Sequence, residues 1–103
     1  MTLRVRFSAH ATAEFLDATS WYEQQRPGLG DVFIEAVDAA VDVVAEWPGS
    51  GSLVDDVAVE LGVRRAPIGG FPYHLAYRVL ADHMRVLAVA HDRRKPGYWT
   101  SRA

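Results

Sequence analysis

Hydrophobic residues recur along this chain with two different periods, which predict where strands and helices form. Near the start, Leu3, Val5 and Phe7 alternate with arginines, and this period of two indicates a half-buried strand. From about Ala9 to Gln25 the apolar residues recur at helical spacing and predict a helix, which Ser8 is placed to cap.

A second helix is predicted after the breaker sequence Arg-Pro-Gly-Leu-Gly at residues 26–30. Asp31 is placed to cap this helix, which runs to about Trp47 and stops before Pro48 and Gly49. Its core stripe consists of Phe33, Ala36, Val37, Ala40, Val41 and Val44. The opposite face is acidic and has no lysine or arginine, with Glu35, Asp38, Asp42 and Glu46. We interpret this face as solvated or paired with arginines of a sheet, in preference to a metal site.

The second half of the chain has the pattern of a sheet. Residues 48–60 are predicted to form a connecting loop that contains Asp55 and Asp56. Three strands are then predicted, over about Leu61–Ile68, about Tyr73–Leu80 and about Met84–His91, with a short hairpin turn at residues 81–83. The last strand is apolar at successive positions, which predicts a central strand with both faces covered.

The order of these elements is β-α-α-β-β-β and predicts an α+β fold. The simplest closure is an antiparallel sheet from the last three strands with the helical hairpin packed on one face. At 103 residues, we expect residues 1–103 to form one domain around one core.

Composition narrows the classes of function. The chain has no cysteine, which excludes disulfides, thiolate catalysis and cysteine zinc sites. It begins with an alternating segment that does not resemble a signal peptide, and no apolar run approaches the roughly 18 residues of a membrane span. We therefore expect a cytoplasmic protein without membrane contact, and we predict neither a cofactor nor a metal.

Charge is distributed unevenly, although the formal net charge is only -2. Residues 1–60 contain eleven acidic and three basic residues, whereas residues 61–103 contain two acidic and eight basic residues. Two interpretations stay open: one face serves an anionic partner, or the two halves neutralise each other across the fold.

The candidate contact surface is at the end of the chain. The predicted strand that ends at His91 leads into three consecutive cations, a Pro-Gly break and two aromatic residues. Such a segment can grip an anion or a partner protein. The predicted contact residues are Arg78, Arg93, Arg94, Lys95, Tyr98 and Trp99. Arg64 and Arg65 are neighbours in a strand, so at most one of them faces a shared site.

Motifs along nearly the whole chain are similar to those of the RelE/ParE superfamily of bacterial toxin–antitoxin modules, whose members include plasmid-stabilisation proteins. The resemblance includes the turn at Pro27-Gly28-Leu29-Gly30, then Phe71-Pro72-Tyr73, and finally the segment from His91 to Trp99. The last two of these motifs resemble the ParE-like branch most closely. The resemblance implies the same helix-backed sheet.

The superfamily implies two alternative mechanisms. The ParE-like branch inhibits DNA gyrase by trapping it on cleaved DNA and is not itself a catalyst. The RelE-like branch is a metal-independent endoribonuclease that cleaves messenger RNA on the ribosome. Arg65 stands where that branch has one of two lysines, but the second falls near Pro67 and an expected arginine is replaced by His74. These departures, with a sequence pI of about 6.0, favour the gyrase inhibitor.

If the chain is a ribonuclease, the resemblance and the acid–base chemistry of histidine select Arg65, His91, Arg93 and Tyr98 as its catalytic residues. Under either mechanism the resemblance implies a cognate antitoxin, which would bind a groove of the helical hairpin and the basic second half of the chain. A third alternative is a diverged, non-toxic member whose only task is to bind its antitoxin.

Overall fold

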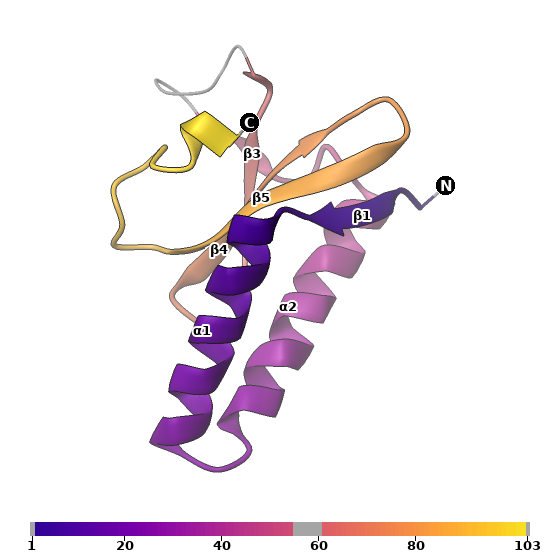
Figure 1. Ribbon diagram of the computed structural model, residues 1–103. Helices are drawn as coiled ribbons and strands as arrows, with labels where there is room; N and C mark the ends of the chain where they lie inside the picture. The colour runs from indigo at the N-terminus through magenta and orange to yellow at the C-terminus, as the bar shows by residue number, and fades with distance from the viewer. Residues whose placement is uncertain (1, 55–60, 103) are drawn as a thin grey trace.

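The computed structural model describes residues 2–54 and 61–102 and confirms the predicted α+β fold, with the helical hairpin on one face of a sheet (Figure 1). The predicted loop residues 55–60 lie outside the described residues. The elements are β1 (Arg4–Phe7), α1 (Ala9–Gln25), α2 (Leu29–Glu46), β2 (Ser52–Leu53), β3 (Arg64–Pro67), β4 (Tyr73–Val79), β5 (His83–His91) and the short 3-10 helix η2 (Thr100–Arg102).

The sheet has the strand order β1-β5-β4-β3-β2, and β5 is central as predicted. Strand β4 pairs antiparallel with both β3 and β5, whereas β1 is parallel to β5 and makes the sheet mixed. Strand β2 lies where the sequence predicted only loop, and it pairs with Arg64 and Arg65 of β3. A two-residue strand has no hydrophobic period, so sequence patterning could not reveal it.

The two helices begin in different ways. As predicted, Ser8 caps α1, because its hydroxyl oxygen accepts a hydrogen bond from the Ala11 amide at 3.0 Å. The prediction that Asp31 caps α2 is wrong, because Gly28 occupies that position with a left-handed φ of 90°. The Glu23 carboxylate replaces a capping side chain and accepts hydrogen bonds from the amides of Gly28 and Gly30.

Two apolar clusters lie on opposite faces of the sheet. The larger cluster fills the space between sheet and helices, and its buried members include Phe33, Val37, Val44, Leu75, Tyr77, Met84 and Val86. The smaller cluster lies on the face away from the helices and consists of Val63, Ala76, Leu87, Ala88, Ala90 and Trp99. A register shift opposite Ala76 and Tyr77 lets Leu87 and Ala88 join the same cluster although they are consecutive in β5.

Candidate functional site

The C-terminal segment, residues 92–102, folds back over the sheet face that lies opposite the helices (Figure 1). Trp99 is only 2% exposed and packs in the smaller apolar cluster beside Val63 and Leu87. The prediction that Trp99 is displayed at the surface is therefore wrong. Because the helices cover one face only, Trp99 supplies the apolar cover of the other face.

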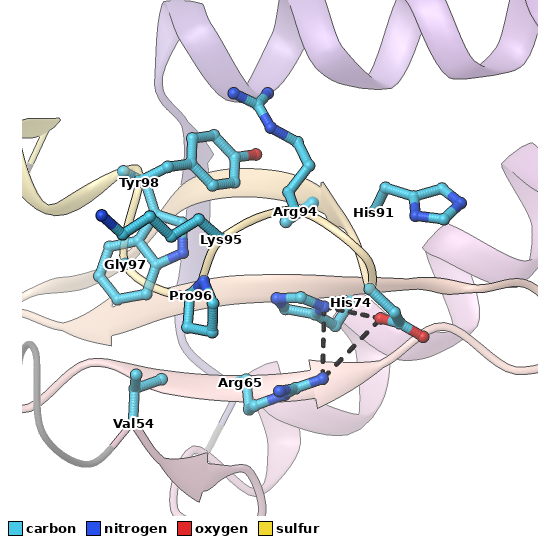
Figure 2. Close-up of a pocket in the computed structure, with 12 residues that line it drawn as sticks. Val54, Arg65, His74, His91, Arg94, Lys95, Pro96, Gly97 and Tyr98 are labelled. Carbon is cyan, nitrogen blue, oxygen red and sulfur yellow. Dashed lines mark hydrogen bonds and ion pairs between the residues drawn. The ribbon is translucent and has the colours of Figure 1, made fainter.

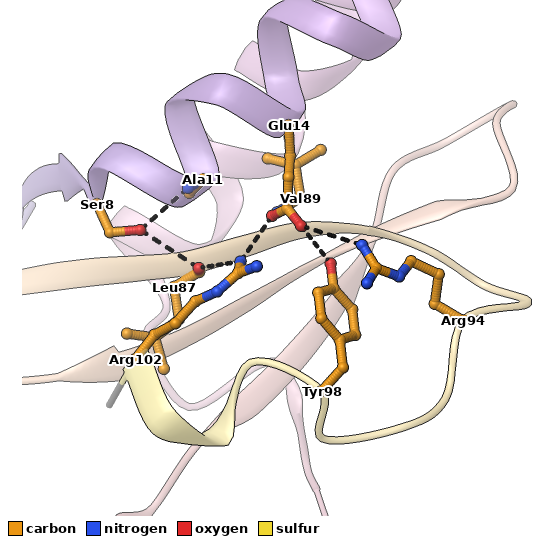
Figure 3. A network of polar contacts seen from close by, with 8 residues as sticks. All are labelled: Ser8, Ala11, Glu14, Leu87, Val89, Arg94, Tyr98 and Arg102. Carbon is orange, nitrogen blue, oxygen red and sulfur yellow. Dashed lines mark hydrogen bonds and ion pairs between the residues drawn. The ribbon is translucent and has the colours of Figure 1, made fainter.

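A single carboxylate, that of Glu14 on α1, fastens this segment to the rest of the fold (Figure 3). Its Oε1 accepts hydrogen bonds from the Val89 amide at 3.1 Å and from Arg102 Nη1 at 2.9 Å. Its Oε2 accepts a hydrogen bond from the Tyr98 hydroxyl at 2.6 Å and lies 3.6 Å from Arg94 Nη1. Glu14 thus joins the helix, the central strand and the C-terminal segment.

Tyr98 is held as a neutral phenol within this network. Burial, followed by the hydrogen bond to Glu14, raises the pKa of Tyr98 to about 12. Its ring is flanked by two guanidinium groups, with Arg94 Cζ 3.6 Å and Arg102 Cζ 5.1 Å from the ring centroid. Contacts with Glu14 and two arginines of the same chain therefore hold Tyr98 in place. Its predicted contact with a partner stays a prediction.

A second group of ionisable side chains gathers from three neighbouring strands (Figure 2). Arg65 lies in β3, His74 lies in β4, and Asp92 directly follows β5. Asp92 Oδ1 lies 2.8 Å from His74 Nδ1 and 3.8 Å from Arg65 Nη2. The cavity beside them measures about 30 Å³ and is bounded by residues 94–99. A water molecule needs about 10–15 Å³ by this measure, so the cavity is too small for an organic substrate.

The protonation of His74 follows from its surroundings. Burial lowers the pKa of His74, an effect that the Asp92 hydrogen bond opposes and the nearby Arg65 reinforces. An ionised carboxylate only accepts hydrogen bonds. In the neutral ring the proton is therefore on Nδ1, and this N–H group donates a hydrogen bond to Asp92. Nδ1 then has no lone pair for Arg65 Nη2, which lies 3.4 Å away, and Nε2 is the ring nitrogen that can accept a hydrogen bond.

Of the four residues predicted for a ribonuclease, Arg65, His91 and Tyr98 line the same small cavity and Arg93 does not, but their side chains are engaged with other partners. The His91 ring packs edge-on against Tyr73 at 5.0 Å, and its Nδ1 accepts a hydrogen bond from the Arg93 amide. Tyr98 is directed to Glu14, and Figure 2 shows His91 turned away from His74. In the part of the chain described, no hydrogen bond or ion pair links the side chains of any two of the four.

The remaining predicted contact residues are cationic. Arg93 and Lys95 are exposed, and neither forms an ion pair within residues 2–54 and 61–102. Arg78 lies partly buried in β4, and no described group accepts a hydrogen bond from its Nε. Arg64 and Arg65 point to opposite faces as predicted, since Arg64 donates to the carbonyl oxygen of Gly51 at 2.7 Å.

Apolar grooves flank the helical hairpin. A hollow of about 530 Å³ lies between the tip of the hairpin and the β3–β4 turn, and its lining includes Tyr22, Leu29, Val32, Ala36 and Phe71. A second hollow of about 230 Å³ lies between α2 and strands β2 and β3, beside Val43 and Pro67. Outside these hollows, Leu16 and Trp21 of α1 are more than half exposed.

Sequence reasoning missed Glu14 and Asp92. Glu14 could have been found, because it lies three residues after Ala11 and four before Ala18, on the buried stripe of α1. A carboxylate on such a stripe requires a partner. Asp92 carries no comparable signal, since its partner His74 is 18 residues away on another strand.

The described part of the chain contains neither a candidate membrane span nor a cluster of metal-ligating side chains. No helix there is long and apolar enough to cross a membrane. Three or more potential metal-ligating side chains do not gather anywhere within residues 2–54 and 61–102.

The structure is that of a small α+β protein with a cationic C-terminal segment, and comparison with known proteins identifies the family. Residues 5–96 match the family described as the ParE toxin of the type II toxin–antitoxin system parDE, and the chain belongs to this family. Among solved structures, a chain of the chromosomal ParDE toxin–antitoxin system from P. aeruginosa is similar, with 16% sequence identity and a TM-score of 0.62. The alignment covers 87% of this chain and 96% of that chain, and it shows a shared fold. No curated protein matches.

Proposed function

We propose that this protein is a growth-arresting toxin that inhibits DNA gyrase in the cytoplasm and is neutralised by a cognate antitoxin. The membership of the ParE toxin family supports this proposal. The structural observation that carries it is the exposed pair Arg93 and Lys95, displayed on a segment that Trp99 and Glu14 fix in place. A contact loop held in one conformation loses little entropy when it binds a partner.

The antitoxin would bind through the helical hairpin. The two hollows beside α2 offer apolar area, and the exposed Leu16 and Trp21 extend it along α1. An amphipathic segment that folds on binding recognises grooves of this kind. Coexpression with an antitoxin encoded beside this chain would then yield a stable complex. Failure to form any complex would contradict this part of the proposal.

The decisive experiment compares two activities of the purified protein. One assay measures gyrase supercoiling and the cleaved-DNA complex, and the other measures translation in vitro. We expect gyrase to be inhibited while translation continues.

The double variant Arg93→Gln/Lys95→Gln should weaken inhibition at least tenfold, and Arg26→Gln, which removes a charge at the helical tip, should not. Translation arrest with active gyrase would overturn the proposal. Activity in neither assay, with antitoxin binding intact, would identify a diverged non-toxic member.

Removal of the last residues is a poor test of this surface. Trp99 is a core residue and Arg102 binds Glu14, so a truncated chain loses packing as well as contacts. Substitutions at Arg93 and Lys95 remove exposed charge and leave the packing of Trp99 unchanged. The substitutions therefore separate a contact role from a structural one.

A ribosome-dependent endoribonuclease is the second candidate, and one observation favours it. His74 donates from Nδ1 to Asp92 and keeps Nε2 as an acceptor, the arrangement of a general base, with the Arg65 cation close by. His74→Gln would abolish cleavage of messenger RNA in the translation assay and leave gyrase inhibition unchanged. Unaltered cleavage in this variant, or its absence in the wild type, would exclude this role of His74.

A further inference from the structure

The charges of this protein are sorted by layer. The helices α1 and α2 carry eight acidic residues and no lysine or arginine. The five strands carry six arginines and no acidic residue. The molecule therefore has an acidic helical layer packed against a basic sheet, which would orient it toward any polyanion.

Three of the strand arginines lie side by side across adjacent strands. Arg85 of β5 pairs directly with Arg6 of β1 on one side and with Arg78 of β4 on the other. Residues directly opposite in neighbouring strands point to the same face. We call Arg6, Arg85 and Arg78 the arginine row, and Arg4 lies two residues before Arg6 on the same face.

The arginine row lies on the sheet face away from the helices. The neighbours Val5 and Phe7 in β1, and Met84 and Val86 in β5, all pack in the cluster under the helices. Side chains alternate along a strand, so the arginines between them point to the opposite side. At that end of the sheet the β4–β5 hairpin extends beyond the helices, and β1 lies against the C-terminal end of α2 (Figure 1).

These positive charges are left uncompensated by the described residues. No ion pair within residues 2–54 and 61–102 includes an arginine of the row or Arg4, and no described group accepts a hydrogen bond from Arg78 Nε. Arg6 affects one carboxylate only weakly: the pKa of Asp82 is lowered first by its hydrogen bond to His83 and least by Arg6. Like charges directly opposite destabilise a sheet, so this arrangement is costly without an anion.

We propose that the arginine row binds the phosphodiester backbone of a nucleic acid. Guanidinium groups match phosphate oxygens in a bidentate way. Strands lie about 4.8 Å apart, so the row spans about 10 Å of backbone, enough for two or three phosphates. A protein partner would need an apolar anchor beside the row. Among the described residues of β4 the exposed large apolar side chain is Val79, and it points to the other face of the sheet. A nucleic acid therefore fits this surface better than a protein. This inference does not depend on gyrase being the target.

The test measures binding of a 20-base-pair DNA duplex, the matching single strand and an RNA of the same sequence over a range of salt concentrations. For duplex DNA, the logarithm of the affinity should fall with the logarithm of salt concentration with a slope of about -3, at about -0.9 per phosphate. Arg78→Gln/Arg85→Gln should lower the slope magnitude by about 2 and the affinity at low salt at least tenfold. The preferred nucleic acid identifies the source of the phosphates.

Two controls keep the outcome decisive. Arg26→Gln removes one charge from the helical tip, and the single variant Arg85→Gln removes one from the row. Only Arg85→Gln should weaken binding, while its thermal midpoint stays equal to or above that of the wild type because like-charge repulsion is relieved. Equal binding by Arg85→Gln and the wild type would overturn the proposal. Displacement of the DNA by polyglutamate at matched charge concentration would show an acidic-peptide site instead.

Discussion

At the scale of single residues, Glu14 has more polar partners than any other acidic side chain described. Its side chain is 18% exposed, and it accepts from one amide, one phenol and one guanidinium while a second guanidinium lies nearby. Hydrogen bonds to a charged group are stronger than neutral ones, and their loss leaves buried donors unsatisfied. The attachment of the C-terminal segment to α1 therefore depends on the charge of this residue.

Replacement of Glu14 by Gln should lower the free energy of unfolding by about 2 kcal/mol, because the NH2 group of the amide cannot accept a hydrogen bond and the negative charge beside two guanidinium groups is lost. It should also lower the pKa of Tyr98 from about 12 toward its ordinary value, since Glu14 is one cause of the elevation. Urea unfolding and ultraviolet titration of the tyrosines measure the two effects. Asp17→Asn, an exposed change on the same helix, should shift stability by less than about 0.5 kcal/mol. Equal unfolding curves for Glu14→Gln and the wild type would refute this role.

At the scale of elements, the C-terminal segment behaves as a third layer. A sheet with helices on one face leaves the other face open to water unless a segment covers it. Here residues 92–102 supply the cover with one large side chain, Trp99, while Arg93 and Lys95 stay on the outside. The same segment thus combines packing on its inner side and charge on its outer side.

Trp99→Ala should destabilise the protein by about 3–5 kcal/mol, the usual range for removal of a buried aromatic side chain. Trp47→Ala is the matched control, because Trp47 is 67% exposed, and it should change stability by less than about 0.5 kcal/mol. Urea unfolding followed by circular dichroism measures both. Similar losses in the two variants would show that the segment is not anchored by Trp99.

At the scale of the whole molecule, His74 and Tyr98 are two of the titrating groups that limit the pH range of stability, and the raised pKa values of Tyr22 and Tyr73 act in the same direction as that of Tyr98. The pKa of His74 is lowered in the fold, chiefly by burial, so the unfolded chain binds its proton more tightly. The contribution of His74 is complete above its unfolded pKa of about 6.5 and is lost as the pH falls below it. The pKa of Tyr98 is raised to about 12, so its contribution is complete below about pH 10 and is lost as the pH rises toward 12.

The contributions of His74 and Tyr98 to the free energy of unfolding should therefore be constant between about pH 7 and pH 10. Urea unfolding at pH 5 to 11.5 measures the profile. His74→Gln should flatten the acid side, and Tyr98→Phe should flatten the alkaline side. A wild-type profile that these substitutions leave unchanged would contradict the assignment.

The sequence predicted the parts of the fold that rest on local patterns. Both helices, the central position of β5 and the cap at Ser8 follow from periodicity and capping chemistry, and the structure confirms them. The parts that escaped prediction depend on contacts between distant residues. The pairing of β1 with β5 and the burial of Trp99 join segments whose separation along the chain no period encodes.

The candidate site was predicted less completely than the fold. The cations Arg93 and Lys95 are exposed as the sequence suggested, and their role as contacts stays a prediction. Arg65 and His74 are close together, but Asp92 joins them only because β5 ends beside β4. The sequence selected Arg78 as a contact residue but not Arg6 or Arg85, because only the strand register aligns the three arginines in a row.

The parallel pairing of β1 with β5 also affects when this toxin becomes complete during synthesis. Residues 4–7 are made early, yet their strand partner, residues 83–86, is translated 79 codons later. Contacts of such long sequence separation form late in folding. The arginine row therefore forms only after β5 has left the exit tunnel. A nascent chain does not display this surface, so any ligand of the row meets only the completed sheet.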